Sequence, residues 1–200
     1  MRSPVYWHPY LYYGAMRLLY GRHYRARYAE LARRIDMGAS VVDLCCGDCR
    51  LYTQELARRG GSYLGLDFNA GFVRHARARG VPAELWDFRR DPIPAADVIV
   101  LQGSLYQFMP DHVEVIDRML KAARQAVIIT EPIMNLSTSP NPFVAWMARR
   151  AADPGSHPTP ARFTETELRD LFKRFPVREC VVVAGGRELL GVFDPRGRKV

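Results

Sequence analysis

Short runs of apolar residues alternate along the chain with longer segments whose apolar residues recur every three or four positions. The first pattern predicts buried β-strands and the second predicts amphipathic helices. Side chains that cap the starts of helices are expected at three places: Asn69, Asp111 with Glu114, and Thr164 with Glu167. The predicted strands are residues 41–44, 62–67, 83–87, 97–101 and 126–130, and the predicted helices are residues 50–59, 70–79, 111–124 and 164–175.

This alternation of strands and helices is typical of a parallel, doubly wound sheet. Two further strands, residues 177–183 and 188–193, flank Gly185-Gly186, which is the signal of an antiparallel hairpin. The predicted fold class is therefore α/β, with a mostly parallel seven-stranded sheet and an antiparallel C-terminal hairpin.

The two ends of this pattern predict the domain organisation. Residues 1–36 alternate aromatic side chains with histidine and arginine and suit one or two helices. This extension would pack against the domain, cover a pocket as a lid, or touch a membrane surface. Residues 37–200 form a single domain, and a proline-rich insertion is expected at about 132–161.

Composition and charge limit the classes of function. The net charge of +8 raises the possibility of a nucleic-acid partner, but the arginines are spread along the whole chain, as on a solvated surface. No apolar run has the roughly 18 residues that a membrane span needs, so stable membrane insertion is not expected. Three of the four cysteines lie within 45–49, which is too clustered for a disulfide framework and predicts a cytoplasmic protein.

Polar side chains lie in or directly after the first four predicted strands: Asp43, Asp67, Asp87 and Gln102. The carboxyl ends of parallel strands meet at one edge of the sheet, where such folds bind ligands. An acid about 20 residues after a glycine turn is the expected partner of ribose hydroxyls, and Asp67 follows Gly47 at that spacing. Asp87 would accept a hydrogen bond from an adenine amino group, with Phe68 and Phe88 as apolar walls.

The turn after the first strand distinguishes between nucleoside ligands. A dinucleotide requires Gly-x-Gly-x-x-Gly, and the corresponding positions here are Cys45, Gly47 and Arg50. A ligand without phosphates, such as S-adenosylmethionine, relaxes that requirement.

With these residues the sequence resembles the class I S-adenosylmethionine-dependent methyltransferases, in their small-molecule branch, over about residues 37–194. The resemblance implies a Rossmann-like methyltransferase fold and S-adenosylmethionine as cofactor, with S-adenosylhomocysteine as product. The Asn/Asp-Pro-Pro-aromatic segment of the family's nucleic-acid branch is missing. The cofactor-binding residues that the resemblance implies are Asp43, Cys45, Cys46, Gly47, Asp48, Asp67, Phe68, Asp87, Phe88, Gln102, Gly103 and Tyr106.

The cysteines at 45, 46 and 49 allow three interpretations: small packing residues under the cofactor, thiolate ligands of a metal, or a redox group. We expect packing and no metal, because structural zinc sites need four ligands in paired spacings.

The function expected from this sequence is methyl transfer to a small-molecule acceptor of apolar or aromatic character. The alternatives are an RNA or protein methyltransferase and a non-catalytic binding module, in which Cys45 and Cys49 would weaken cofactor binding. No catalytic residue is assigned. Five side chains are candidates for a general base: His8, His23, Tyr13, Tyr106 and Glu131.

Overall fold

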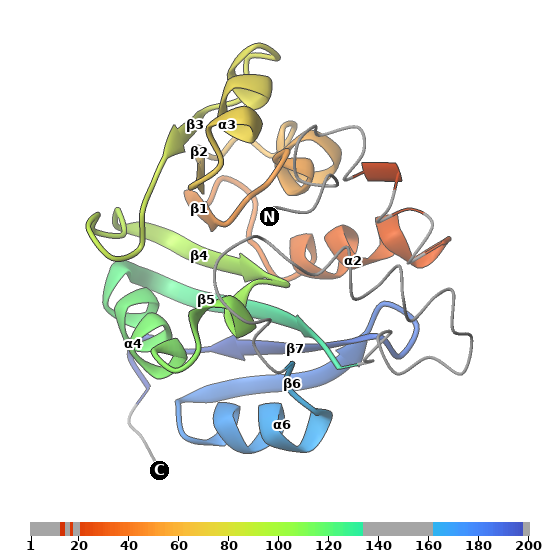
Figure 1. Ribbon diagram of the computed structural model, residues 1–200, viewed down its shortest axis with the longest axis vertical. Coiled ribbons are helices and arrows are strands. Elements are labelled where there is room, and N and C mark those ends of the chain that lie inside the picture. Colours follow the sequence, from red (N-terminus) through yellow and green to blue (C-terminus); the bar gives the residue numbers. More distant parts are fainter. Residues whose placement is uncertain (1–12, 15–16, 18–20, 134–161, 198–200) are drawn as a thin grey trace.

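The computed structural model describes residues 13–14, 17, 21–133 and 162–197 (Figure 1). Its centre is a seven-stranded sheet with the strand order β3-β2-β1-β4-β5-β7-β6. Strand β7 is antiparallel to both of its neighbours, and all other pairs are parallel. The predicted fold class is confirmed. The strands are β1 (Val41–Leu44), β2 (Tyr63–Asp67), β3 (Ala83–Leu85), β4 (Ala96–Gln102), β5 (Ala123–Pro132), β6 (Val177–Val183) and β7 (Glu188–Phe193).

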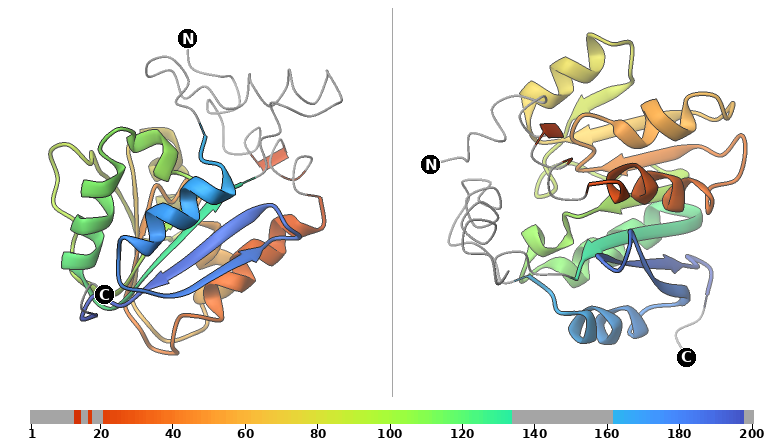
Figure 2. Two further views of the ribbon diagram at one scale, coloured as in Figure 1. Left: turned by 90° about the horizontal axis from the view of Figure 1, so that it is seen from below. Right: turned by 90° about the vertical axis from the view of Figure 1, so that its right-hand side faces the viewer.

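Helical segments cover both faces of this sheet (Figure 2). One face packs against α2 (His23–Ala32), the π-helical η2 (Tyr52–Leu56) and α3 (Ala70–Arg77). The opposite face packs against the 3₁₀ segment η3 (Leu105–Phe108), α4 (His112–Ala122) and α6 (Glu165–Lys173). The central strands are buried on both faces, which explains why their sequences are nearly continuous apolar runs.

Two of the three predicted helix caps are confirmed. The Asn69 side chain accepts a hydrogen bond from the Gly71 N–H, and Thr164 with Glu167 forms a complete capping box. The capping box predicted for Asp111 and Glu114 is wrong. Asp111 precedes α4 with φ −83° and ψ 10° instead of an extended conformation, and its side chain makes no cap hydrogen bond.

Several boundaries also differ from prediction. Strand β3 ends at Leu85 because Asp87 lies in a turn, where its carbonyl accepts from the N–H groups of Arg90 and Asp91. Strand β5 extends to Pro132, since its last residues pair with β7. The predicted helix over 50–59 is mostly a π-helical segment. Most of the predicted insertion at 132–161 lies outside the described residues, as do residues 1–12, 15–16 and 18–20 of the N-terminal extension.

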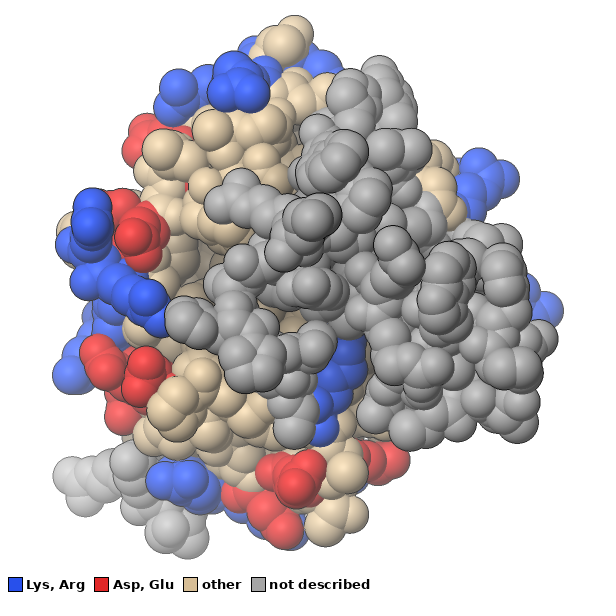
Figure 3. All heavy atoms as spheres, in the orientation of Figure 1, with Lys and Arg blue, Asp and Glu red and all other residues tan. Residues whose placement is uncertain are grey.

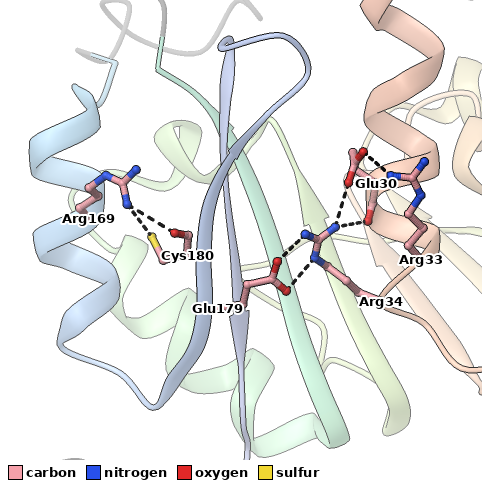
Figure 4. Close-up of polar contacts among 6 residues, drawn as sticks. All are labelled: Glu30, Arg33, Arg34, Arg169, Glu179 and Cys180. Carbon is pink, nitrogen blue, oxygen red and sulfur yellow. Dashed lines mark hydrogen bonds and ion pairs between the residues drawn. The ribbon is translucent and has the colours of Figure 1, made fainter.

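The segment directly after helix α2 is tied to the distant edge strand β6 by an ion pair (Figure 4). Arg34 donates from Nε to Glu179 at 2.9 Å and makes a second, shorter contact to the same carboxylate. The same guanidinium donates to the carbonyl and carboxylate of Glu30. This arrangement holds α2 against the sheet. None of the helices in the described part of the chain is both long and apolar enough to cross a membrane.

Candidate functional site

The turn after β1 has an unusual backbone. Cys45, Gly47 and Cys49 have φ values of 53°, 55° and 55°, in the left-handed region that favours glycine. Glycine fits this region without strain, whereas a cysteine there costs roughly 1–2 kcal/mol. At Cys45 and Cys49 the backbone of the turn thus has the left-handed conformation that glycine usually adopts.

Asp67, the last residue of β2, holds this turn in place. Its carboxylate accepts from the Gly47 N–H at 2.8 Å and from the Asn69 N–H at 2.8 Å. Burial raises the pKa of Asp67 to about 6, although the two backbone hydrogen bonds lower it. The predicted approach of Asp67 to the glycine turn is therefore seen, with a hydrogen bond that joins the ends of β1 and β2.

A cavity with about 360 Å³ of empty space, partly open to solvent, lies beside this turn. Five of the predicted site residues, Asp43, Cys45, Cys46, Gly47 and Asp48, line it, and Gln102 from the end of β4 is the sixth. Buried Gln102 Nε2 has no hydrogen-bond partner within the described chain. The structure thus brings half of the predicted residues to one cavity. The remaining lining residues are Arg27, Tyr28 and Leu51.

Arg27 and Tyr28 were missed by sequence reasoning. Both come from α2, where Tyr24, Tyr28 and Leu31 recur with helical spacing and form its buried face. Arg27 lies on that face, three residues after Tyr24, and this spacing was the available signal. It is 4% exposed and pairs with the fully buried Glu188 of β7 at 2.8 Å.

Asp43 lies inside the sheet, opposite Gly65 of β2 and Val100 of β4. Its carboxylate accepts a hydrogen bond of 2.7 Å from the Tyr63 hydroxyl. Burial raises the pKa of Asp43 to about 7, an effect that the Tyr63 hydrogen bond opposes. This acid therefore gains or loses its charge near neutral pH.

Asp48 brings a second acid to the cavity wall, where it pairs with Arg50 Nε at 2.7 Å. Burial raises its pKa, and the Arg50 charge opposes that shift. The Arg50 guanidinium also lies 3.7 Å from the centre of the Tyr13 ring. Part of the N-terminal extension is thus in contact with the turn.

The other predicted site residues do not line this cavity. Asp87 is half exposed and accepts from the Arg89 N–H, and Phe68 is also about half exposed. The Phe88 ring packs edge-on against Trp86 and Phe108, under Arg118. Gly103, with φ 63°, donates its N–H to the Thr130 carbonyl at 2.7 Å.

Tyr106 and Glu131 form a neighbouring buried group. Glu131 accepts from the Leu105 N–H at 2.8 Å, and the Arg162 guanidinium lies 4.4 Å from the centre of the Tyr106 ring. Burial raises the pKa of Glu131 to about 8, while the Leu105 hydrogen bond and the Arg162 charge lower it. Of the other candidate bases, His23 lies against Gly185 of the β6–β7 turn, and His8 is outside the described residues.

The cysteines divide between the two faces of the sheet. Cys45 packs against the α4 and α6 side, whereas Cys46 and Cys49 pack on the α2 side, with their sulfurs 3.4 Å apart. Within the described ranges no three histidine, cysteine or acidic side chains are grouped so as to hold a metal ion.

Neither a protein-family model nor a curated protein matches the chain. Solved structures match its fold. A chain from the complex between the Haloferax volcanii Trm112 methyltransferase activator and a methyltransferase has a TM-score of 0.67 at 17% identity, over 91% of this chain and 94% of that chain. Magnesium protoporphyrin IX methyltransferase from Synechocystis PCC 6803 with bound SAH has a TM-score of 0.63 at 14% identity, over 86% and 84%. The cyclase SpnF has a TM-score of 0.59 at 18% identity, over 80% and 60%. The fold is that of the class I methyltransferases.

Proposed function

We propose that the chain binds S-adenosylmethionine in the cavity beside the turn after β1 and transfers its methyl group to a small-molecule acceptor. One observation carries the proposal. The left-handed turn is held by a hydrogen bond from Gly47 to Asp67, directly beside a cavity that presents Arg27, Asp43 and Asp48. This is the ligand-binding edge of a doubly wound sheet.

The charges of the cavity suit the methionine part of this cofactor, which carries an ammonium and a carboxylate group. Asp43 and Asp48 offer acceptors for the ammonium, and Arg27 offers donors for the carboxylate. The unpartnered Gln102 Nε2 is a further donor.

Among the structural neighbours, the Synechocystis methyltransferase was crystallised with bound SAH. The cyclase SpnF has the same fold, so the fold by itself does not imply methyl transfer. Cofactor binding and methyl transfer are therefore separate questions. We therefore assign binding from the site and test transfer independently.

When bound, S-adenosylmethionine supplies an electrophilic methyl group on a sulfonium. The residues of this chain would position it and exclude water, because charge disperses during such a transfer. Tyr28 at the cavity wall is aromatic, and aromatic rings attract cations. We further propose that residues 1–36 act as a lid, based on the contact between Tyr13 and Arg50. The free cysteines fit a reducing compartment, so we assign the protein to the cytoplasm.

For the acceptor, a small molecule is favoured over RNA by the distribution of charge. Figure 3 shows lysine and arginine in several separate groups, with acidic side chains between them. A continuous basic surface, as nucleic-acid binding requires, is not formed by the described residues on this face. The aromatic side chains of Phe88, Phe108 and Tyr106 follow β3 and β4 at the same edge of the sheet, outside the cavity lining, and on this basis we extend the proposal to an apolar or aromatic acceptor.

Isothermal titration of the reduced protein with S-adenosylmethionine and S-adenosylhomocysteine tests the binding step. We expect saturable 1:1 binding, and about tenfold weaker binding for Asp43→Asn, since an ionised acceptor is lost. Asp170→Asn, at an exposed position of α6, is the matched control and should bind like the unmodified protein. Absence of binding at millimolar ligand would contradict the proposal.

Formation of S-adenosylhomocysteine in the presence of acceptor pools tests the transfer step. Turnover with an extract of small aromatic metabolites, and none with RNA or denatured protein, is the expected result. Binding without turnover on any pool would favour the non-catalytic module. Turnover on RNA that falls steeply with salt would favour the RNA alternative.

A further inference from the structure

Cys46 and Cys49 have the spacing Cys-x-x-Cys in the turn after β1, and their side chains are in contact. The two sulfurs lie 3.4 Å apart, with the Cys49 thiol donating to Cys46. A disulfide bond is about 2.05 Å long, so closing it requires an approach of roughly 1.4 Å. This pair is distinct from Cys45, which packs on the other side of the sheet.

The backbone between the two cysteines suits a disulfide. The Cys49 N–H donates to the Cys46 carbonyl at 2.9 Å, which closes a four-residue turn. Such a turn brings its first and last Cα atoms within about 7 Å, and disulfides span about 4.4–6.8 Å between Cα atoms. The left-handed conformation of Cys49, with φ 55°, is part of this geometry.

The neighbouring strand leaves space for both sulfurs. Gly65 of β2 lies against the pair, and a Cβ atom at that position would be 2.8 Å from Cys46 Sγ and 2.8 Å from Cys49 Sγ. Any larger residue at 65 would therefore displace the two thiols.

The two thiols differ in access. Cys46 is partly exposed and lines the cavity, whereas Cys49 is 0% exposed. A small oxidant that enters the cavity reaches Cys46 first. Cys49 is then in position to attack the mixed disulfide on Cys46 and release the bound thiol.

We propose that Cys46 and Cys49 form a reversible thiol–disulfide pair at the wall of this cavity, oxidised by a low-molecular-weight disulfide such as oxidised glutathione. The Cys46 thiolate attacks the glutathione disulfide, which forms a mixed disulfide and releases one glutathione thiolate. The Cys49 thiolate then attacks Cys46 Sγ, which forms the internal bond and releases the second glutathione thiolate. The two cysteine protons end on the two glutathione molecules, so the pair is oxidised by two electrons and the glutathione disulfide is reduced.

The environment of the two thiols affects how fast they are oxidised. The contact with the neighbouring Cys49 thiol and burial both raise the pKa of Cys46, which disfavours its thiolate. Because the thiolate is the attacking species, oxidation should accelerate as pH rises. The pair is therefore slow to oxidise at neutral pH.

A regulatory consequence rests on the proposed function. A cofactor in the cavity would cover Cys46, and we infer that S-adenosylmethionine slows oxidation of the pair. Conversely, oxidation draws Cys46 toward Cys49 and away from its position in the reduced cavity wall.

The test uses the reduced full-length chain, incubated with oxidised glutathione between pH 7 and 9 with and without S-adenosylmethionine. We expect two of the four thiols to be lost, a mass lower by two hydrogens, and a peptide map that joins Cys46 to Cys49. Cys49→Ser should stop at a mixed disulfide on Cys46, and Cys46→Ser should leave Cys49 unreacted in the folded protein. Cys45→Ser and Cys180→Ser are matched controls and should still form the bond.

The proposal of a Cys46–Cys49 disulfide would be overturned by four titratable thiols after oxidation of the folded chain, or by a bond that includes Cys45 or Cys180. The binding proposal fails separately. If the disulfide forms while titration calorimetry detects no S-adenosylmethionine binding, the pair stands and the proposed function falls. If the cofactor binds without slowing oxidation, the regulatory link is overturned.

Discussion

The carboxylate of Asp67 accepts a 2.8 Å hydrogen bond from the backbone N–H of Gly47, 20 residues earlier in the chain. Asp67 is the last residue of β2, and Gly47 is one of the residues with left-handed φ in the turn after β1. The second carboxylate oxygen accepts from Asn69, which in turn caps α3. One buried side chain therefore fixes two neighbouring connections at the proposed site.

Asp67→Asn should destabilise the protein by about 1–3 kcal/mol. An asparagine has one acceptor oxygen, so its NH₂ group would face one of the two N–H donors and leave a buried donor unsatisfied. Urea unfolding at pH 8 measures the change, with Asp36→Asn at an exposed position as control. A stability within 0.5 kcal/mol, on the scale of ordinary surface substitutions, would contradict this role.

Glu131 should make stability fall as pH rises. Its pKa in the folded protein is about 8, above the unfolded value of 4.5, so the folded state holds the proton more tightly. Its stabilising contribution is full below about pH 4.5 and is lost as pH rises through 8. Relative to Glu131→Gln, whose oxygen still accepts from Leu105, the unmodified protein should lose on the order of 4 kcal/mol across that range.

The measurement is a set of urea unfolding curves at pH 4.5, 6, 7 and 8.5 for both proteins. Glu84→Gln, on an exposed position of β3, is the control and should follow the unmodified protein. Parallel pH profiles for Glu131→Gln and the unmodified protein would refute the buried, proton-binding role of Glu131.

The pairing of Arg34 with Glu179 should couple α2 to β6. Both partners are partly exposed, so a double-mutant cycle with Arg34→Gln and Glu179→Gln should give a coupling energy of about 0.2–1 kcal/mol, smaller at 1 M salt. Cofactor affinity should fall several-fold in either variant, because α2 carries Arg27 and Tyr28 to the cavity. Arg33, which pairs with Glu30 in Figure 4, is the matched control and should show no coupling with Glu179.

Gly65→Ala should destabilise the protein by about 1–3 kcal/mol through overpacking. Its methyl group would meet both Cys46 Sγ and Cys49 Sγ at 2.8 Å, so it should also slow formation of the disulfide. Adding Cys46→Ala should restore part of the lost stability, which a double-mutant cycle of unfolding free energies detects. Strictly additive effects would show that the methyl group does not press on the sulfur of Cys46.

The order of elements followed from the sequence because it depends on local patterns. Buried parallel strands need apolar residues on both faces, as in β4, and the spacing of Thr164 and Glu167 is sufficient for a capping box. Asp111 has the same spacing to Glu114, but its backbone has φ −83° and ψ 10° and its side chain makes no cap hydrogen bond. A cap therefore needs both the residue types and a tertiary path that permits its geometry.

The candidate site depended more on tertiary structure. The spacing of Asp67 from Gly47 predicted their approach, since neighbouring parallel strands end at one edge. The register of β1 and β2 decided that Asp43 meets Tyr63, and the docking of α2 decided that Arg27 and Tyr28 reach the cavity. Sequence alone determined the sheet, its order of alternation and the acids at its edge, because these follow from periodicity. The tertiary structure decided burial, hence the raised pKa values, and the packing of Cys46 and Cys49 against Gly65 of β2, because these depend on how distant elements pack.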